Sequence, residues 1–152
     1  MGVSLTACAQ TDIGLVRKSN EDAFVVADLT GGSLLGQQHI ARFEVGQHGV
    51  LLAVSDGMGG HAAGEVASAI VIESLRRSLG SQASVGASDT LLEKATIQAN
   101  LEVWQAAHHP GRENMGATLT ALFVHDTTAY IAEVGDSRAY VLPGRASPRR
   151  FA

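Results

Sequence analysis

Several protein classes are excluded by what the sequence lacks. Cys8 is the only cysteine among the 152 residues, so an intrachain disulfide and a thiolate metal cluster are both ruled out, and we expect a cytoplasmic location. No apolar run reaches the roughly 18 residues that a membrane-spanning helix requires. The first residues show no basic segment followed by an apolar one, so we expect no signal peptide and no membrane partner.

A surplus of basic residues is missing as well. The chain has 15 acidic and 11 basic residues and a net charge of −4, which argues against nucleic acid as a partner. Apolar residues make up 45% of the sequence, enough for the core of one globular domain. We find no internal repeat.

The apolar pattern predicts strands, then two helices, then strands again. Runs of strand length predict strands over residues 3–10, 23–27, 50–55, 116–124, 129–134 and 138–142. Helical spacing predicts helices over 63–79, ended by Gly80, and over 90–108, with Thr90 as the capping residue. Residues 11–19 and 81–88 are predicted as loops, and 29–49 as a long connection or an irregular hairpin. This order favours antiparallel sheets with a helical layer, an α+β fold, over alternating βαβ units.

Asp56 follows the apolar strand over 50–55 and precedes a glycine-rich turn. A carboxylate in this position is held rigidly and still faces solvent or a ligand, which suits a metal ion. Hard cations such as Mg²⁺ and Mn²⁺ prefer oxygen donors, and Gly57 leaves its carbonyl accessible to an ion. An isolated Asp-Gly pair is more often a turn or a helix N-cap, so that interpretation stays open.

The same turn also matches a dinucleotide-binding pattern. Residues 57–62, Gly-Met-Gly-Gly-His-Ala, fit G-x-G-x-x-A between a strand and a helix. Asp56 would, however, set a carboxylate beside a pyrophosphate, and a second helix follows where a parallel strand should. The acidic residue that binds the ribose is missing too. A dinucleotide-binding module is therefore the weaker hypothesis.

Two further acidic clusters supply candidate site residues. Glu21 and Asp22 precede the strand over 23–27, and as neighbours they would point to opposite faces of it. One could meet a metal ion while the other orients its surroundings, and Arg17 offers a planar guanidinium suited to phosphate. Asp136 lies in the turn formed by Gly135-Asp136-Ser137. Each cluster taken alone could be an exposed loop or a hairpin turn.

Four segments together carry a more specific signal. They are residues 17–22 (Arg-Lys-Ser-Asn-Glu-Asp), 56–65 (Asp-Gly-Met-Gly-Gly-His-Ala-Ala-Gly-Glu), 116–118 (Gly-Ala-Thr) and 135–140 (Gly-Asp-Ser-Arg-Ala-Tyr). In this order and spacing, the chain resembles the metal-dependent serine/threonine protein phosphatases of the PPM (type 2C) family, its bacterial branch above all, over residues 5–142. The resemblance implies part of an α/β/β/α four-layer sandwich of two antiparallel sheets flanked by helices.

The resemblance also implies a reaction and a site. The reaction is hydrolysis of phosphoserine or phosphothreonine in proteins by a metal-activated water, within a kinase/phosphatase signalling pair. Asp56 would bridge two Mn²⁺ or Mg²⁺ ions, Glu21 and the Gly57 carbonyl would serve one of them, and Asp136 would help to hold a third, more labile ion. Asp22 would support these ligands without touching the ions. Arg17 would bind the substrate phosphate and, with Asp56, act in catalysis.

The sequence departs from the family pattern in two places. Met58 stands where eukaryotic relatives carry a histidine proposed as the general acid, so we assign no general acid. The two further metal-binding aspartates of the family, downstream of Gly-Asp-Ser, have no match here. We therefore expect residues 1–142 to be the N-terminal portion of a truncated phosphatase domain and 143–152 to be a tail that does not match it. The alternative function is a catalytically silent fragment or pseudophosphatase that only binds partners.

Overall fold

The computed structural model describes residues 2–34, 40–59, 62–82 and 88–142. Its largest element is a five-stranded sheet in which β2 (Asp22–Asp28), β4 (Val50–Met58), β6 (Leu119–His125) and β7 (Thr128–Val134) lie side by side in this order. The short β5 (Gly116–Ala117) also pairs with β4. All strand pairs within the described residues are antiparallel. This topology contradicts the dinucleotide-binding hypothesis, because that fold needs parallel strands.

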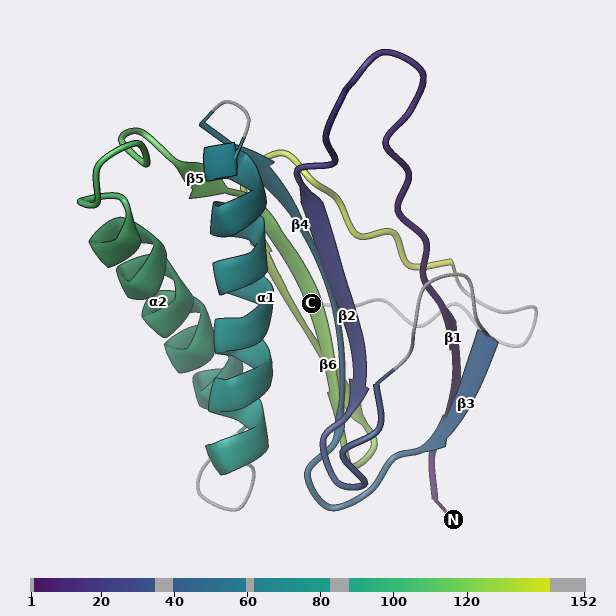
Figure 1. The fold of residues 1–152 in the computed structure, drawn as a ribbon. Coiled ribbons are helices and arrows are strands. Elements are labelled where there is room, and N and C mark those ends of the chain that lie inside the picture. The colour runs from purple at the N-terminus through teal and green to yellow at the C-terminus, as the bar shows by residue number, and fades with distance from the viewer. Residues whose placement is uncertain (1, 35–39, 60–61, 83–87, 143–152) are drawn as a thin grey trace.

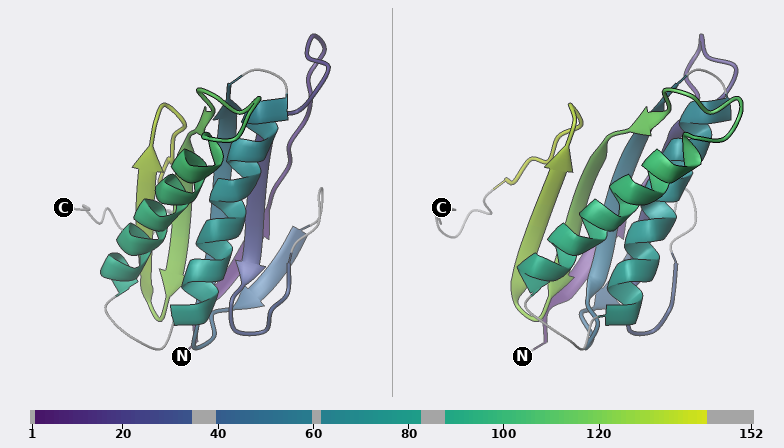
Figure 2. Two further views of the ribbon diagram at one scale, coloured as in Figure 1. Left: turned by 60° about the vertical axis from the view of Figure 1, so that its left-hand side comes forward. Right: turned by 90° about the vertical axis from the view of Figure 1, so that its left-hand side faces the viewer.

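Two helices cover one face of this sheet (Figures 1 and 2). α1 (Ala62–Gln82) packs against β2 and β4, and α2 (Ser88–Ala106) packs beside α1 and reaches β7. The apolar stripe predicted for the first helix is confirmed, since Ala63, Ala67, Val71, Leu75 and Leu79 are all buried. No helix within the described residues is apolar over enough of its length to span a membrane.

The opposite face of the large sheet carries a second, smaller sheet. β1 (Ser4–Cys8) and β3 (Ile40–Glu44) pair with each other, and Ala7 and Phe43 from them pack with Val26 and Val50 of the large sheet. The chain is therefore an α+β protein with two antiparallel sheets and a helical layer, as predicted. A second helical layer is not found in the described part of the chain.

Several element boundaries differ from the sequence prediction. α1 continues through Gly80 to Gln82, because the φ of Gly80 is not in the left-handed region that ends helices. α2 begins at Ser88, so Thr90 lies inside the helix and is not its capping residue. β4 does not stop before Asp56 but runs on to Met58, because Asp56 and Gly57 find strand partners on β2 and β5.

Two predicted segments have a different structure. Residues 138–142 form no strand, and the backbone N–H of Ala139 instead donates a hydrogen bond of 2.7 Å to the Glu133 carboxylate. The segment over 29–49 contains β3, whose partner is the distant β1 and not a neighbouring hairpin strand. Residues 35–39 of that segment and 83–87 of the predicted linker lie outside the described residues.

Candidate metal centre

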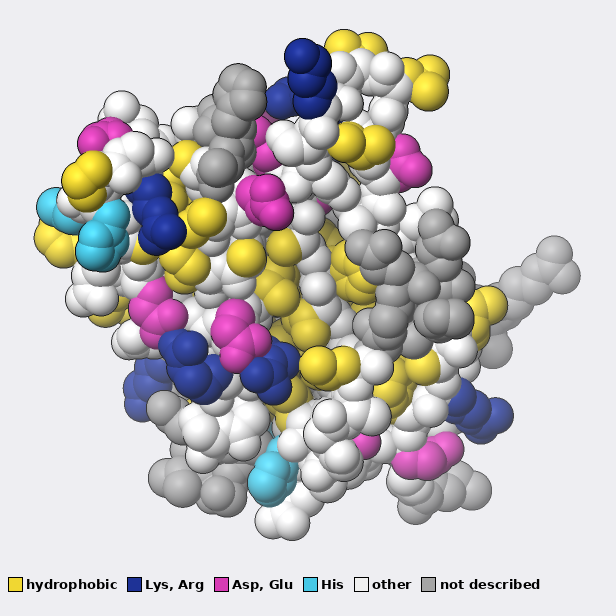
Figure 3. All heavy atoms as spheres, viewed as in Figure 1, with side chains coloured by type: hydrophobic (Ala, Val, Ile, Leu, Met, Phe, Trp, Pro, Cys, Tyr) yellow, Lys and Arg dark blue, Asp and Glu magenta, His cyan; other side chains and the backbone are white. Residues whose placement is uncertain are grey.

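The motif residues gather at one end of the large sheet, where β4 ends and α1 begins (top of Figure 1). A cavity of about 780 Å³ opens there, and we call it the acidic cavity. Its lining includes five of the six predicted site residues, namely Arg17, Glu21, Asp22, Asp56 and Gly57. Figure 3 shows basic and acidic side chains close together at this end of the molecule.

Asp22 and Asp56 lie directly opposite each other on neighbouring strands. Residues paired in this way point to the same face of the sheet, and two like charges so placed destabilise it. The pKa of the Asp22 carboxyl is raised, first by lost contact with water and then by the negative charge of Asp56, while Arg17 acts in the opposite direction. A divalent cation between these strands would relieve the repulsion.

Thr118 holds Asp56 in place from the other side of β4. The Asp56 N–H donates to the Thr118 hydroxyl at 3.0 Å, and the Thr118 N–H donates to the Asp56 carbonyl at 2.9 Å. The Thr118 hydroxyl also lies 2.8 Å from that of Ser137, in a hydrogen bond in which either oxygen could be the donor. The motif over 116–118 thus bonds the backbone of Asp56 directly, and the motif over 135–140 is linked to it through Thr118.

Glu21 lies on the helix side of the strand, where Gly57 meets Gly64 of α1. The Gly57 N–H donates to the Glu21 carbonyl at 3.1 Å. A Cβ on Gly57 would collide with the Gly64 carbonyl oxygen, and a Cβ on Gly64 would lie 3.1 Å from the Glu21 carboxyl carbon. Only glycine fits this close approach of strand and helix. Glu21 and Asp22 therefore serve opposite faces, as predicted.

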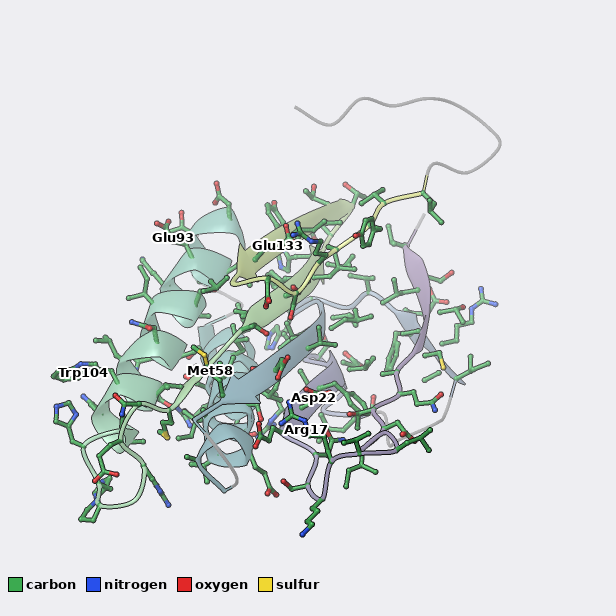
Figure 4. The ribbon with its side chains drawn as sticks, turned by 90° about the horizontal axis from the view of Figure 1, so that it is seen from above. Arg17, Asp22, Met58, Glu93, Trp104 and Glu133 are labelled. Carbon is green, nitrogen blue, oxygen red and sulfur yellow. The ribbon has the colours of Figure 1, made fainter. Side chains whose placement is uncertain are left out.

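Arg17 lines the acidic cavity and lies close to Asp22 (Figure 4). Its Nη1 lies 3.9 Å from the Glu21 Oε2, and its side chain is 76% exposed, so most of its donors remain available to an anion. The loop that carries it is closed at its base by a hydrogen bond of 2.7 Å from the Asn20 amide to the Thr11 hydroxyl. The Asn20 side-chain oxygen also accepts the Asp22 N–H at 3.1 Å. Asn20 thus joins the phosphate-binding candidate to the strand with the carboxylates.

The donors at this end of the sheet fit a hard divalent cation, because carboxylates and a glycine carbonyl are the oxygen ligands that Mg²⁺ and Mn²⁺ prefer. Within the part of the chain that the structure describes, no group of three or more His, Cys, Asp or Glu side chains is placed to hold an ion. An ion bound to Glu21, Asp56 and Gly57 would therefore need further donors, such as water or residues outside the described part.

Other predicted features do not line the acidic cavity or fall outside the described residues. Asp136 is exposed in the bend after β7 and is not part of that lining. Asp56 is not a helix N-cap, since it lies within β4, six positions before the first residue of α1. His61 falls outside the described residues.

Sequence reasoning gave no role to Thr118, Ser137 or Asn20. All three stand inside the matched motifs, which is the only signal that marked them. Thr118 acts through a hydrogen bond to Asp56, 62 positions away in the chain, whereas the Asn20 amide bonds the nearer Thr11 and Asp22.

Comparison with known proteins supports the resemblance to the phosphatase family that the motifs indicated. The model of the family described as protein phosphatase 2C matches residues 19–151. The chain is 37% identical over 139 residues to the serine/threonine protein phosphatase PstP of Mycobacterium tuberculosis, covering 91% of this chain and 23% of that protein. It is 33% identical over 137 residues to the serine/threonine phosphatase stp of Listeria monocytogenes, covering 88% of this chain and 48% of that protein.

A solved structure is similar in fold as well as in sequence. It is the catalytic domain of PstP in complex with two manganese ions, with a TM-score of 0.62, 31% identity, and coverage of 90% of this chain and 49% of that chain. The present chain thus spans about half or less of the length of these relatives, 48% of one and 23% of the other.

Proposed function

The chain belongs to the protein phosphatase 2C family, and from this premise we propose that it takes part in the metal-dependent hydrolysis of phosphoserine and phosphothreonine in proteins. One observation carries the proposal. Residues from all four motif segments converge on Asp56, through its pairing with Asp22, the contact of Gly57 with Glu21, and the hydrogen bonds through Thr118 to Ser137.

We assign the metal-holding role to Asp56, Glu21 and the Gly57 carbonyl, with Mn²⁺ or Mg²⁺ as the ions. Bound divalent ions supply such a site with a water of lowered pKa and with positive charge that stabilises a phosphoryl group in its transition state. Asp22 supports Asp56 from the neighbouring strand. A weaker third ion at Asp136 is part of this proposal, and Asp136 itself does not line the acidic cavity.

Arg17 binds the substrate phosphate in this proposal. Its side chain lines the acidic cavity and is exposed, and a planar fork of N–H donors suits two phosphate oxygens at once. The weak ion pair with Glu21, at 3.9 Å, keeps the guanidinium close to the carboxylates without occupying it fully. A phosphate bound by Arg17 in this way would lie next to the acidic cavity.

The proposed substrates are phosphoproteins made by an opposing kinase, in a cytoplasmic signalling pair, with neither nucleic acid nor membrane as partner. The lone Cys8 supports the cytoplasmic location, and the net charge of −4 argues against nucleic acid as a partner.

Hydrolysis of a phosphothreonine peptide with added Mn²⁺ tests the proposal directly. Asp56→Asn should lose activity, and Asp126→Asn, a matched change in the hairpin turn at the other end of the sheet, should keep it. Asn tolerates the left-handed φ of 52° at that position as Asp does. Equal rates in the wild type and in Asp56→Asn would overturn the proposal.

The alternative is a silent module that only binds partners. It is favoured by the lack of a three-residue cluster of ligating side chains in the described part of the chain. Calorimetric titration with Mn²⁺ separates the two functions, because tight binding that Asp56→Asn abolishes supports the phosphatase, and no binding to the wild type supports the silent module.

A further inference from the structure

A second cavity lies between α2 and the edge of the large sheet that β5 forms with β4. Its volume is about 270 Å³, and we call it the apolar cavity. Val71, Ala99, Val103, Met115 and Leu119 line it, and each of them is buried, so the cavity reaches the interior and is not a shallow surface groove. No charged side chain lines it within the described residues.

The apolar cavity and the acidic cavity share one side chain. Met58 lines both and follows directly after Gly57 on β4. A Cβ on Gly116 would lie 2.8 Å from the Met58 ε-methyl carbon, so the thioether packs against the backbone of β5. Figure 4 shows Met58 between Trp104 on one side and Arg17 and Asp22 on the other.

The lining is suited to an aromatic ring. Met58 and Met115 present two thioethers, which make favourable contacts with ring edges, and Trp104, whose indole meets the His108 ring edge-to-face with ring centroids 4.4 Å apart, adds an aromatic surface. Met58 and Trp104 are 62% and 61% exposed, so both can be reached from solvent. The volume exceeds the roughly 150 Å³ of a protein cavity known to accept benzene.

One polar group in the lining is free to bind a ligand. The Thr96 hydroxyl already donates to the Leu92 carbonyl at 2.8 Å. Asn100 is exposed, and its amide makes no hydrogen bond to any side chain or backbone group in the described part of the chain. An apolar pocket with one or two placed polar groups is the usual form of a small-molecule site.

We propose that the apolar cavity binds a small neutral aromatic molecule of bicyclic size, with one polar group hydrogen-bonded to the Asn100 amide. The site is separate from the acidic cavity except for Met58, and its existence does not depend on the proposed phosphatase activity.

Methionine methyl NMR tests the proposal without an activity assay. The chain has three methionines, so ¹³C-labelling of the ε-methyl groups gives one signal each for Met1, Met58 and Met115. Indole, a neutral bicyclic molecule with one N–H donor, serves as the probe. Its ring current should shift the Met58 and Met115 signals saturably and leave Met1 unchanged.

Three variants locate the binding. Ala107→Leu adds bulk at a half-buried position of the lining and should weaken indole binding by at least about tenfold. Asn100→Leu removes the polar partner and should weaken it by about threefold to tenfold. Gln105→Leu adds a leucine to an exposed position on the same helix outside the cavity and should change nothing. Thermal melts followed by circular dichroism confirm that each variant is folded.

Several results would overturn the proposal. One is the lack of a saturable shift at Met58 and Met115, and another is equal binding by wild type and Ala107→Leu. Saturable binding of N-acetyltryptophanamide in place of indole would assign the cavity to a side chain of a partner protein. Signals that move with protein concentration in the absence of indole would assign it to a second copy of this chain.

Discussion

The two halves of β4 belong to one continuous strand but differ in burial and in the residues they carry. In the inner half, Val50 and Leu51 are fully buried, between β2 and β6. In the outer half, Asp56 and Met58 are exposed, Asp56 faces a second carboxylate, and Gly57 packs where no side chain fits. The inner half stabilises the fold, while the outer half carries local charge repulsion and close backbone contact at the proposed metal site.

This contrast predicts how each half responds to substitution. A change in the inner half should alter the free energy of unfolding without a direct effect on ligands. A change in the outer half should alter metal or phosphate binding, and the removal of a carboxylate there should even stabilise the metal-free protein.

Leu51→Ala should have the largest effect on stability. Its side chain is fully buried against α1, so the substitution leaves a cavity and should lower the free energy of unfolding by about 2–5 kcal/mol. Urea unfolding followed by circular dichroism measures this. Val54→Ala, on the same strand but 48% exposed, is the matched control and should lose less than about 1 kcal/mol. Equal losses would contradict the contrast between buried and open positions.

Gly57→Ala should have the second-largest effect on stability. The added methyl meets the Gly64 carbonyl oxygen and the Glu21 backbone, neither of which can move aside as a side chain could, so we expect a loss of about 1–3 kcal/mol. Mn²⁺ binding, measured by calorimetry, should weaken at the same time.

Gly80→Ala is the control for that substitution. A Cβ at Gly80 meets nothing within 4 Å, and the residue lies inside α1, so alanine should stabilise the protein by about 0.5–1 kcal/mol. If both alanine substitutions destabilised the protein equally, the close contact between Gly57 and Gly64 would not be the cause of the loss at Gly57.

Asp56→Asn should have opposite effects on binding and on stability. The like-charged pair with Asp22 is removed, so the metal-free protein should gain about 0.5 kcal/mol in the free energy of unfolding, whereas Mn²⁺ affinity should fall at least about tenfold. Unfolding in EDTA and calorimetry with Mn²⁺ provide the two measurements. A stability loss without any change in Mn²⁺ affinity would mean that Asp56 has a structural role only.

The pH dependence of metal-free stability should show the smallest effect. The pKa of Asp22 is raised above its ordinary value of 3.8, so the folded state binds this proton more tightly than the unfolded state. Its contribution to stability should therefore be fully present below that value and decline as the pH rises through the raised pKa. Unfolding in EDTA at a series of acidic pH values should show a shallower decline for Asp22→Asn, and an unchanged slope would refute the role of Asp22.

The sequence predicted most of the elements and part of the site. The stripe from Ala63 to Leu79 predicted α1, and the run from Val50 predicted the central strand, because periodicity reports which face is buried. Element ends were predicted less well. Gly80 has a residue type that ends helices, but α1 continues to Gln82. Thr90 has a residue type that caps helices, but α2 already begins at Ser88. The strand predicted over 138–142 has the right composition and pairs with no described strand.

Motif spacing identified the carboxylates of the candidate site but not the groups that hold those carboxylates in place. Arg17, Glu21, Asp22, Asp56 and Gly57 could be chosen from motif spacing, and the structure brings all five to one cavity. Asp136 shares the motif signal, but it is exposed in the bend after β7 and is not part of that lining. The hydrogen bonds that link Asp56 through Thr118 to Ser137 leave no periodic pattern in the sequence, so they could not be predicted from it.

Most of the strands and helices, and the residue types available as oxygen donors, could be predicted from the sequence, because local periodicity and side-chain chemistry are readable along the chain. The fold alone shows that Asp22 stands opposite Asp56, that Glu21 lies on the helix side at Gly64, and that Met58 lines both the acidic cavity and the apolar cavity. Strand register and helix packing depend on contacts between residues far apart in the chain, so the two halves of β4 acquire their different roles only when the sheet and α1 come together.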